Sequence, residues 1–530
     1  MSGIQQVWPT PELAGQEGPS ARITVGMHVA NRLWPISLVL VSLLLFLLNT
    51  RHGIGILPDS TRYLGLAPSQ DAPLYSWVLA AVTKLGLTRA QSAEMVGLIL
   101  ACINPLLIWQ LLARMTRRPA YAAVGTALII FAPTFVALHA AAMSEPLFLC
   151  FIFLSLLTLL RFWETADRRW LIACSIAIGV AGLTRFTAPP LGAAIAIGLL
   201  LNRRVPFGRR VVDVVILAAL SSAIFLSWSL LSQMVAGHSL GRTLAFNGNM
   251  GAKAWHTSLV TLLSWLVPSQ VPDKYRLLLS LLAAICSAAL VFWQISRTVR
   301  RTGAEAAPER LLPAVLTLFL PFYLVFFFVA ASIEANQTLV PRYALPIYVT
   351  TILLMTIVIA EARGVSGVIG RLQTILIAVA ALVLVGNVVR TAQRTHQAYA
   401  QGVGYSSLAW MRSPTMQAVA HLPANTTIYT NAPDAIAYVL RRHAVFIPML
   451  ALPRTGHEDP AHPFAAQIYE LRNDPNPSNK VFVFFNRVDW RFYLPTEARL
   501  QGLLQLKLRD RESDGRIYTL PLAAAGDAKP

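Results

Sequence analysis

Residues 33–48 read LWPISLVLVSLLLFLL, a run with no charged side chain. A helix needs about 20 apolar residues to cross a hydrocarbon layer of about 30 Å, and this run approaches that length. Similar runs recur as far as Val389. Of the 530 residues, 55% are hydrophobic and 13% are charged, whereas soluble domains carry about 25% charged residues. The sequence therefore predicts a polytopic membrane protein, with about eleven membrane-spanning helices.

The predicted fold class is an all-α polytopic membrane domain over residues 33–390, followed by a small α/β domain over 391–530. A cytoplasmic tail is expected at 1–32, and long external loops at 50–91 and 232–276. The expected membrane helices cover about 33–49, 93–112, 120–138, 145–163, 170–183, 190–201, 211–231, 277–296, 311–331, 344–360 and 374–390.

The net charge of +19 comes from basic residues that are concentrated in the predicted loops. If the chain alternates sides from its first helix, one side collects most of them, which is typical of short cytoplasmic loops. This set is Arg114, Arg117, Arg118, Arg161, Arg168, Arg169, Arg203, Arg204, Arg209, Arg210, Arg297, Arg300, Arg301, Arg310, Arg363 and Arg371. The N-terminus is thus predicted to be cytoplasmic and the C-terminal domain external. The lipid bilayer is the expected partner of this charge, and nucleic acid is not.

Two local patterns stand out within the membrane region. Ala72–Leu85 has apolar residues at helical spacing and is predicted to form a surface helix in the first external loop. The segment LTRFTAPP, residues 183–190, interrupts two short apolar runs. Irregular backbone at membrane depth is tolerated only where it lines a cavity or is buried in protein, so this break is expected to border one.

The C-terminal region alternates strand and helix signals. It is predicted to contain strands at Thr427–Thr430 and Lys480–Phe485, a helix at Asp434–Arg441, and a hairpin of Leu503–Leu508 with Arg516–Leu520 around Asp514-Gly515. All four cysteines lie in apolar runs, so neither disulfides nor a zinc cluster are expected. No phosphate-binding glycine loop occurs, which argues against an ATPase.

Charged residues on the predicted external face are not explained by topology, and such charges near membrane helices usually serve a function. They are Asp59, Arg62, Glu145, Arg185, Glu334 and Arg342. Asp59 is either a turn residue after Pro58 or a general base that deprotonates a hydroxyl. Glu145 is either a helix-start residue between Ser144 and Pro146 or part of a site.

The two arginines at the breaks are candidates for binding an anion. Arg185 has no acid near it in sequence, and a guanidinium offers a bidentate fork to phosphate. Arg342 has the same character, with extension toward lipid headgroups as its alternative. His139 lacks a partner at metal-ligand spacing, so no metal ligands are assigned.

The order of these motifs resembles the membrane-embedded C-type (GT-C) glycosyltransferases. The closest group contains the protein O-mannosyltransferases, the lipid A aminoarabinose transferase and the bacterial core-sugar transferases. The resemblance covers about residues 30–390. The motifs that carry it are Pro58-Asp59-Ser60-x-x-Tyr63, Ala72-Pro73-Leu74-Tyr75, Ser144-Glu145-Pro146-Leu147, Leu183-Thr184-Arg185 and Arg342-Tyr343-x-x-Pro346; Tyr429-Thr430-Asn431-Ala432-Pro433-Asp434 is similar to the start of external domains in bacterial members.

The resemblance implies transfer of a sugar from a polyprenyl-phosphate-linked donor to a lipid, glycan or protein acceptor, with inversion, at the external face of a bacterial inner membrane. It implies Asp59 as the base, Glu145 as a second catalytic acid, and Arg185, Arg342 and Tyr343 as phosphate-binding residues. Many relatives have a second acid where this chain has Ser60, so a divalent cation is left open. Further candidates for substrate contacts are Arg62, Tyr63, His139 and Glu334.

Three other functions remain open from the residues. A transporter or flippase would also use charges within the membrane, but no internal repeat supports one. An O-antigen polymerase or ligase would place its chemistry in a long late loop, whereas the acid here follows the first helix. A scaffold that presents the external domain would leave Arg185 without a role.

Overall fold

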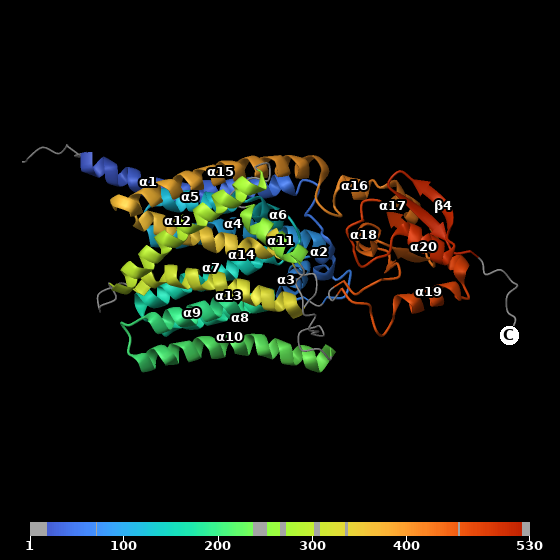
Figure 1. Cartoon of the computed structure of the whole chain (residues 1–530), viewed down its shortest axis with the longest axis horizontal. Helices are drawn as coiled ribbons and strands as arrows, with labels where there is room; N and C mark the ends of the chain where they lie inside the picture. The colour runs from blue at the N-terminus through green and yellow to red at the C-terminus, as the bar shows by residue number, and fades with distance from the viewer. Residues whose placement is uncertain are drawn as a thin grey trace, which may run out of the picture.

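The computed structural model describes residues 19–69, 71–236, 252–264, 272–300, 308–333, 338–453 and 456–521. These residues form a bundle of long helices with a smaller domain at one end (Figure 1). The helices of the bundle and its loops are α1 (Pro19–Asn49), α2 (Pro58–Tyr63), α3 (Leu74–Thr83), α4 (Arg89–Thr116), α5 (Pro119–Ile130), α6 (Pro133–His139), α7 (Glu145–Thr165), α8 (Arg168–Thr184), α9 (Pro189–Leu201), α10 (Phe207–Ala236), α11 (Ala252–Leu263), α12 (Asp273–Arg300), the 3-10 turn η1 (Pro308–Leu311), α13 (Leu312–Ile333), α14 (Pro341–Glu361) and α15 (Gly367–Gln401).

Membrane-spanning helices make up most of this bundle, so the protein is a multi-pass membrane protein. Among the described residues, seven helices are long and apolar enough to cross a bilayer: α4, α7, α10, α12, α13, α14 and α15. The bent pair α5–α6 would bring the number to 8. The short apolar part of α1, Leu33–Asn49, and the shorter helices α8 and α9 run alongside them (Figure 1), and the expected number of about eleven holds only if these also cross.

Proline positions explain where two of the predicted helices begin and end. The prediction of a continuous helix at 120–138 is wrong. α5 and α6 meet at a 66° bend immediately before Pro133. The helix breaks there because proline lacks an N–H donor and restricts the backbone of the residue before it. The predicted break at 183–190 is confirmed, since α8 ends at Thr184 and α9 starts at Pro189.

Two helices extend past the ends of the apolar runs that predicted them. α1 begins at Pro19, inside the segment expected to be a cytoplasmic tail. α15 continues past the predicted domain boundary at 390 to Gln401. One face of its polar extension is buried: Thr395 accepts a hydrogen bond from Asn49 Nδ2 at 2.9 Å, and Thr391 donates to the Phe131 carbonyl at 2.7 Å. Hydrophobicity alone therefore places the end of this helix too early.

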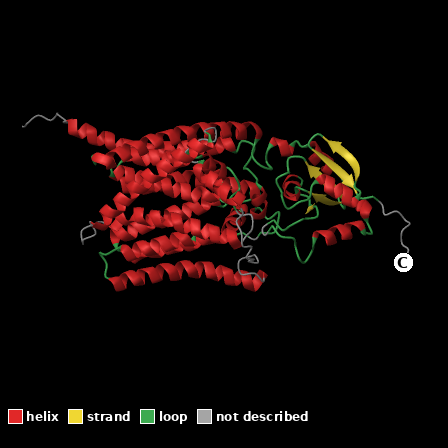
Figure 2. Ribbon diagram, in the orientation of Figure 1, coloured by secondary structure: helices red, strands yellow, loops and turns green. Residues whose placement is uncertain are grey.

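The C-terminal domain is α/β, as predicted, and Figure 2 shows strands only in this part of the described chain. Its five-stranded sheet has the order β2-β1-β3-β5-β4, with β1 parallel to β2 and β3, and β5 antiparallel to β3 and β4. The elements are α16 (Leu408–Met411), α17 (Pro414–Ala420), β1 (Thr427–Thr430), α18 (Pro433–Val439), β2 (Val445–Phe446), α19 (Phe464–Arg472), η2 (Pro477–Asn479), β3 (Lys480–Phe485), α20 (Glu497–Leu504), β4 (Lys507–Glu512) and β5 (Gly515–Thr519).

The predicted hairpin has the correct turn but an incorrect first strand. Leu503 and Leu504 end α20, whose N-terminus is capped by Thr496, and β4 starts only at Lys507. Asp514 at the turn is a structural residue, because its carboxylate accepts hydrogen bonds from the side chains of Ser413 and Thr415 at 2.5 and 2.6 Å.

The linker after α15 connects the C-terminal domain tightly to the first external loop. The Tyr405 N–H donates to the Ile56 carbonyl at 2.7 Å, directly after Gly404 at φ +62°. A Cβ on Gly404 would lie 2.1 Å from the Ile56 carbonyl oxygen, so only glycine fits. Helix α18 packs on α2, and its Asp434 forms a buried ion pair with Arg491 at 2.7 Å. These contacts place the C-terminal domain over α2.

Candidate active site

A cavity of about 1510 Å³ lies where the helical bundle meets the C-terminal domain. Its bundle wall comes from α2 and the loop after it, from the break between α8 and α9, and from the facing ends of α13 and α14. The opposite wall comes from the C-terminal domain. The structure thus brings together segments that are far apart in sequence, and six of the predicted site residues line this one cavity: Asp59, Arg62, Tyr63, Arg185, Arg342 and Tyr343.

Asp59 lies in the first turn of α2, which Pro58 initiates. Its carboxylate forms ion pairs with Arg342, on α14, and with Arg62 Nη2 at 3.0 Å. Burial opposes ionisation of this carboxyl, but the positive charges of Arg342 and Arg62 outweigh it and lower its pKa to about 2. In this arrangement the Asp59 carboxylate is ionised and paired with both arginines.

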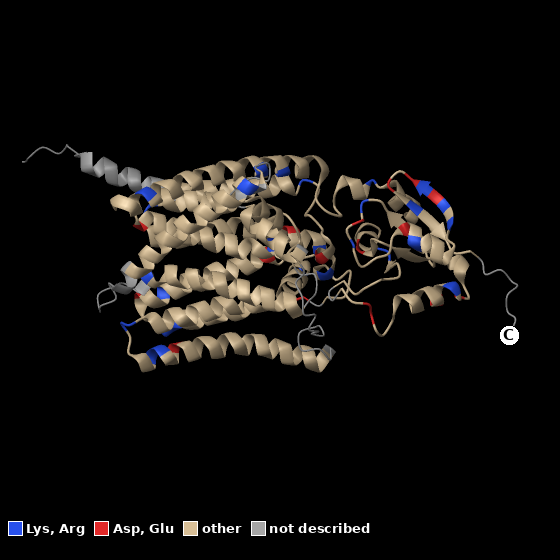
Figure 3. Ribbon diagram, viewed as in Figure 1, with Lys and Arg blue, Asp and Glu red and all other residues tan. Residues whose placement is uncertain are grey.

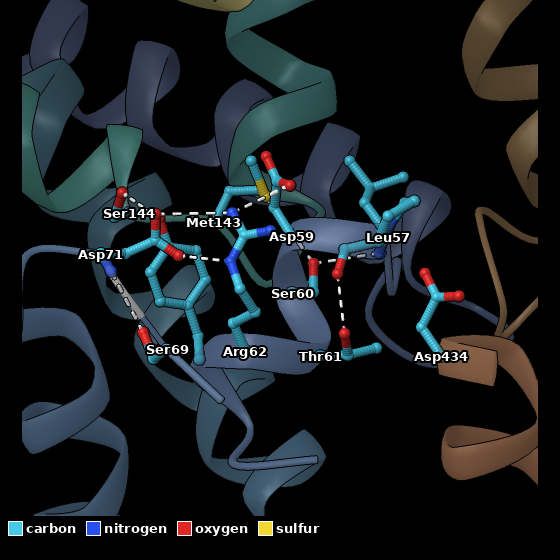
Figure 4. A network of polar contacts seen from close by, with 12 residues as sticks. Leu57, Asp59, Ser60, Thr61, Arg62, Ser69, Asp71, Met143, Ser144 and Asp434 are labelled. Atoms are coloured by element: carbon cyan, nitrogen blue, oxygen red, sulfur yellow. Dashed lines mark hydrogen bonds and ion pairs between the residues drawn. The ribbon is translucent and has the colours of Figure 1, made fainter. Parts of the chain in front are cut away.

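Arg62 connects Asp59 to an acid that the sequence reasoning missed. Figure 4 shows its guanidinium between Asp59 and Asp71, and its Nε donates to Asp71 Oδ2 at 2.6 Å. The available signal was an acid in the first external loop, 12 residues after Asp59. Ser60, where relatives have a second acid, is buried and bonds to the Leu57 N–H and to Met143.

Arg185 caps the C-terminal end of α8 in an extended conformation that directs it away from the helix. Its Nη1 lies 2.8 Å from Glu145 Oε1, at the start of α7, and the Glu145 side chain is only 3% exposed. The angle of this contact falls outside hydrogen-bond geometry, so the two groups form an ion pair only. Arg185 also donates to Ser144 Oγ at 3.3 Å, which in turn bonds to the Tyr63 hydroxyl.

Tyr343 contacts both arginines. The guanidinium carbons of Arg342 and Arg185 are 4.6 and 5.4 Å from its ring centroid, and Arg342 Nη2 donates to its hydroxyl at 2.7 Å. Tyr323 fixes this segment by donating to the Tyr343 carbonyl at 2.8 Å. Two positive groups from different helices are thereby held around one ring, an arrangement suited to a multivalent oxyanion.

Two further predicted site residues, Glu145 and His139, do not line the cavity. Glu145 lies behind Arg185, and Glu334 lies outside the described residues. His139 is 3% exposed; its ring nitrogens contact Asn104 at 2.9 Å and the Phe135 carbonyl at 2.7 Å. His139 therefore supports the packing of α6 against α4. A substrate could contact its ring only if these two helices separated.

An apolar wall adjoins the arginines. Phe186, Phe225, Phe327, Ala330 and Ile333 line the cavity beside Arg185, from the break after α8 and from α10 and α13. Apolar lining next to paired cations suits an amphiphile with a charged head and a hydrocarbon chain.

The acids of the site do not form a metal-binding set. Among the described residues no group of three His, Cys, Asp or Glu side chains is placed to share an ion. Asp59, Asp71 and Glu145 each face an arginine, which competes with a cation for the same oxygens. We therefore derive no step that depends on a divalent cation.

Comparison with known proteins bears on the fold and on the resemblance to glycosyltransferases. A family model described as dolichyl-phosphate-mannose-protein mannosyltransferase matches residues 70–228. The crystal structure of ArnT from Cupriavidus metallidurans in the apo state superposes with a TM-score of 0.52 at 16% identity, covering 92% of this chain and 97% of ArnT. The structure of ArnT from the same organism bound to undecaprenyl phosphate gives a TM-score of 0.51 at 14% identity, covering 93% and 99%. A search of curated protein sequences gives no match. The predicted resemblance to membrane glycosyltransferases of the GT-C fold is therefore confirmed.

Proposed function

We propose that the protein transfers a sugar from a polyprenyl-phosphate donor to an acceptor hydroxyl, with inversion at the sugar carbon. The observation that carries this proposal is the pair Arg185 and Arg342, which both contact the Tyr343 ring and line the same cavity as Asp59. The lipid phosphate would bind between the guanidinium groups. The prenyl chain would leave along the apolar wall that includes Phe186 and Phe327.

The residues support a displacement in one step. The bond between the sugar carbon and the phosphate oxygen breaks, and its electron pair stays on the phosphate, where Arg185 and Arg342 stabilise the charge. The acceptor oxygen forms the new bond to the sugar carbon, and its proton passes to Asp59. Glu145 contributes by holding Arg185 in place at 2.8 Å.

The ion pairs of Asp59 suggest how the donor prepares the base. Phosphate binding would draw Arg342 away from Asp59, which frees an oxygen of the carboxylate to accept the acceptor proton. The same change removes a positive neighbour and raises the pKa of Asp59 from about 2, which makes it a stronger base.

The charge distribution supports an orientation with the cavity on the external face. Figure 3 shows Lys and Arg positions at helix ends and loops far from the C-terminal domain, as expected for the cytoplasmic side. The C-terminal domain and the cavity would then be periplasmic, in the inner membrane of a bacterium. The ArnT structure with undecaprenyl phosphate, which shares the fold, supports a donor of this class.

The test is release of polyprenyl phosphate by the purified full-length protein, supplied with polyprenyl-phosphate sugars and a membrane glycan extract. Asp59→Asn should lower the rate about 10²–10⁴-fold, the usual contribution of a general base, while donor binding persists. Asp510→Asn is the matched control, since Asp510 is half-buried on β4 and does not line the cavity. Wild-type activity in Asp59→Asn would show that Asp59 is not the base.

A further inference from the structure

The C-terminal wall of the cavity exposes two large aromatic side chains. Trp490 and Phe492 are each 55% exposed and line the cavity, on either side of the buried Arg491. The guanidinium of Arg491 lies 4.9 Å from the Trp490 ring and 5.0 Å from the Phe446 ring. Arg491 is itself held by Asp434 and Tyr405, so the two aromatic residues project from a rigid support.

Arg441 lies on the same wall, directly after the end of α18. Its φ of +52° is the left-handed conformation in which helices commonly end, and it turns the chain away from the helix axis. The side chain is exposed and lines the cavity, and its guanidinium stacks on Tyr438 at 5.5 Å. Among the described residues it forms no ion pair.

Charge differs between the two walls. On the bundle side Arg62, Arg185 and Arg342 face Asp59, Asp71 and Glu145, so the charges balance. On the C-terminal side the arginines lining the cavity are Arg441, Arg442 and Arg491, and Asp434 is the acid among the described lining residues.

The N–H groups of Arg442 are already used. They donate to backbone carbonyls of Val419 and Leu422 at 3.2 and 2.9 Å. Arg491 is committed to Asp434. The guanidinium of Arg441 is therefore the group on this wall that remains available to an anion from the cavity.

We propose that this wall is the acceptor subsite and that it binds a saccharide carrying a negatively charged group. The C–H face of a sugar ring would pack on Trp490 and Phe492, which offer flat apolar surfaces, and the anion would pair with Arg441. This inference rests on the proposed function, because it places the acceptor across the cavity from Asp59.

The test uses the full-length protein in nanodiscs and three probes: a phosphorylated disaccharide, its dephosphorylated parent, and inorganic phosphate. Binding is measured by equilibrium dialysis, and polyprenyl phosphate binding is measured on every sample. Wild type should bind the phosphorylated disaccharide most tightly. Trp490→Ala with Phe492→Ala should weaken both disaccharides. Arg441→Gln should weaken only the phosphorylated one, by about tenfold, and Arg441→Lys should restore part of the loss.

Matched controls are Tyr469→Ala, an exposed aromatic residue of α19, and Arg509→Gln on β4, both outside the cavity lining. Neither should change binding of any probe. If polyprenyl phosphate binds normally while the disaccharides fail to bind, or bind equally to all variants, the subsite is refuted and the donor site stands. If wild type does not bind polyprenyl phosphate, the proposed function fails instead.

A fluorescence measurement separates the subsite from contact with lipid. Brominated lipids quench tryptophans that touch the bilayer, so the emission lost in Trp490→Phe should be insensitive to them. Quenching of that emission by brominated lipids would mean that these aromatic residues enter the membrane surface, and would overturn the proposal.

Discussion

Replacing Arg185 by methionine separates its structural effect from its binding effect. In the structure Arg185 is the cation paired with Glu145, whose side chain is 3% exposed and whose oxygens make no hydrogen bond among the described residues. Removing one member of a buried ion pair typically costs about 3–5 kcal/mol, because the other charge stays buried alone. Arg185→Met should therefore be destabilised by that amount.

A second variant tests the cause of this loss. Arg185→Met combined with Glu145→Gln removes both charges, and replacing a whole buried pair by neutral groups is often close to neutral in stability. The double variant should recover most of the unfolding free energy. It should still bind polyprenyl phosphate about 10–150-fold more weakly than wild type, the value of a lost charged hydrogen bond of about 1.5–3 kcal/mol.

Stability is measured by unfolding in mixed micelles, and binding by retention of labelled polyprenyl phosphate on the purified variants. Two results would refute the reasoning. A single variant as stable as wild type would mean that Glu145 does not depend on Arg185. A double variant that binds the lipid like wild type would mean that Arg185 does not hold the phosphate.

Further predictions concern Asp59 and the linker. The pKa of Asp59 is depressed from 3.8 to about 2, so its contribution to stability is fully present well above pH 3.8 and is lost as the pH falls toward 2. Acid unfolding monitored from pH 7 to pH 2 should show no loss from this group above about pH 5, and Asp59→Asn should remove only the part of the pH dependence below that value. If the donor draws Arg342 away, the acid limb of kcat should lie at higher pH than that of kcat/KM, and coincident limbs would contradict this. Gly404→Ala should lower stability by at least about 1 kcal/mol and increase cleavage of the linker in limited proteolysis, whereas Gly502→Ala, with open space around it in α20, should be neutral or stabilising.

Much of the fold follows from local sequence, because a bilayer imposes the same requirement on every segment that crosses it. Long apolar runs predict helices such as α4 and α14, and the interruption before Pro189 predicts a break. Errors occur where packing overrides hydrophobicity. α15 continues through polar residues because Thr395 is bonded to Asn49, and α5 ends early because Pro133 follows.

The site was predictable only in part. Asp59, Arg185 and Arg342 could be selected because a charge beside apolar helices is costly and needs a reason to be there. Asp71 could not, since an acid in an external loop is ordinary until its distance from Arg62 is known. Trp490 and Phe492 belong to a different domain, and no local pattern relates them to a cavity formed by α2 and α14.

By itself the sequence determined the class of protein, the approximate positions of its helices and the residues whose charge needs an explanation, because these depend on composition and spacing along the chain. Only the tertiary structure decided which charges meet. Asp59 and Arg342 are 283 residues apart in sequence and form an ion pair, and Arg185 finds its acid on another helix. Such partners are selected by the packing of whole helices and of the C-terminal domain, which no single stretch of sequence encodes.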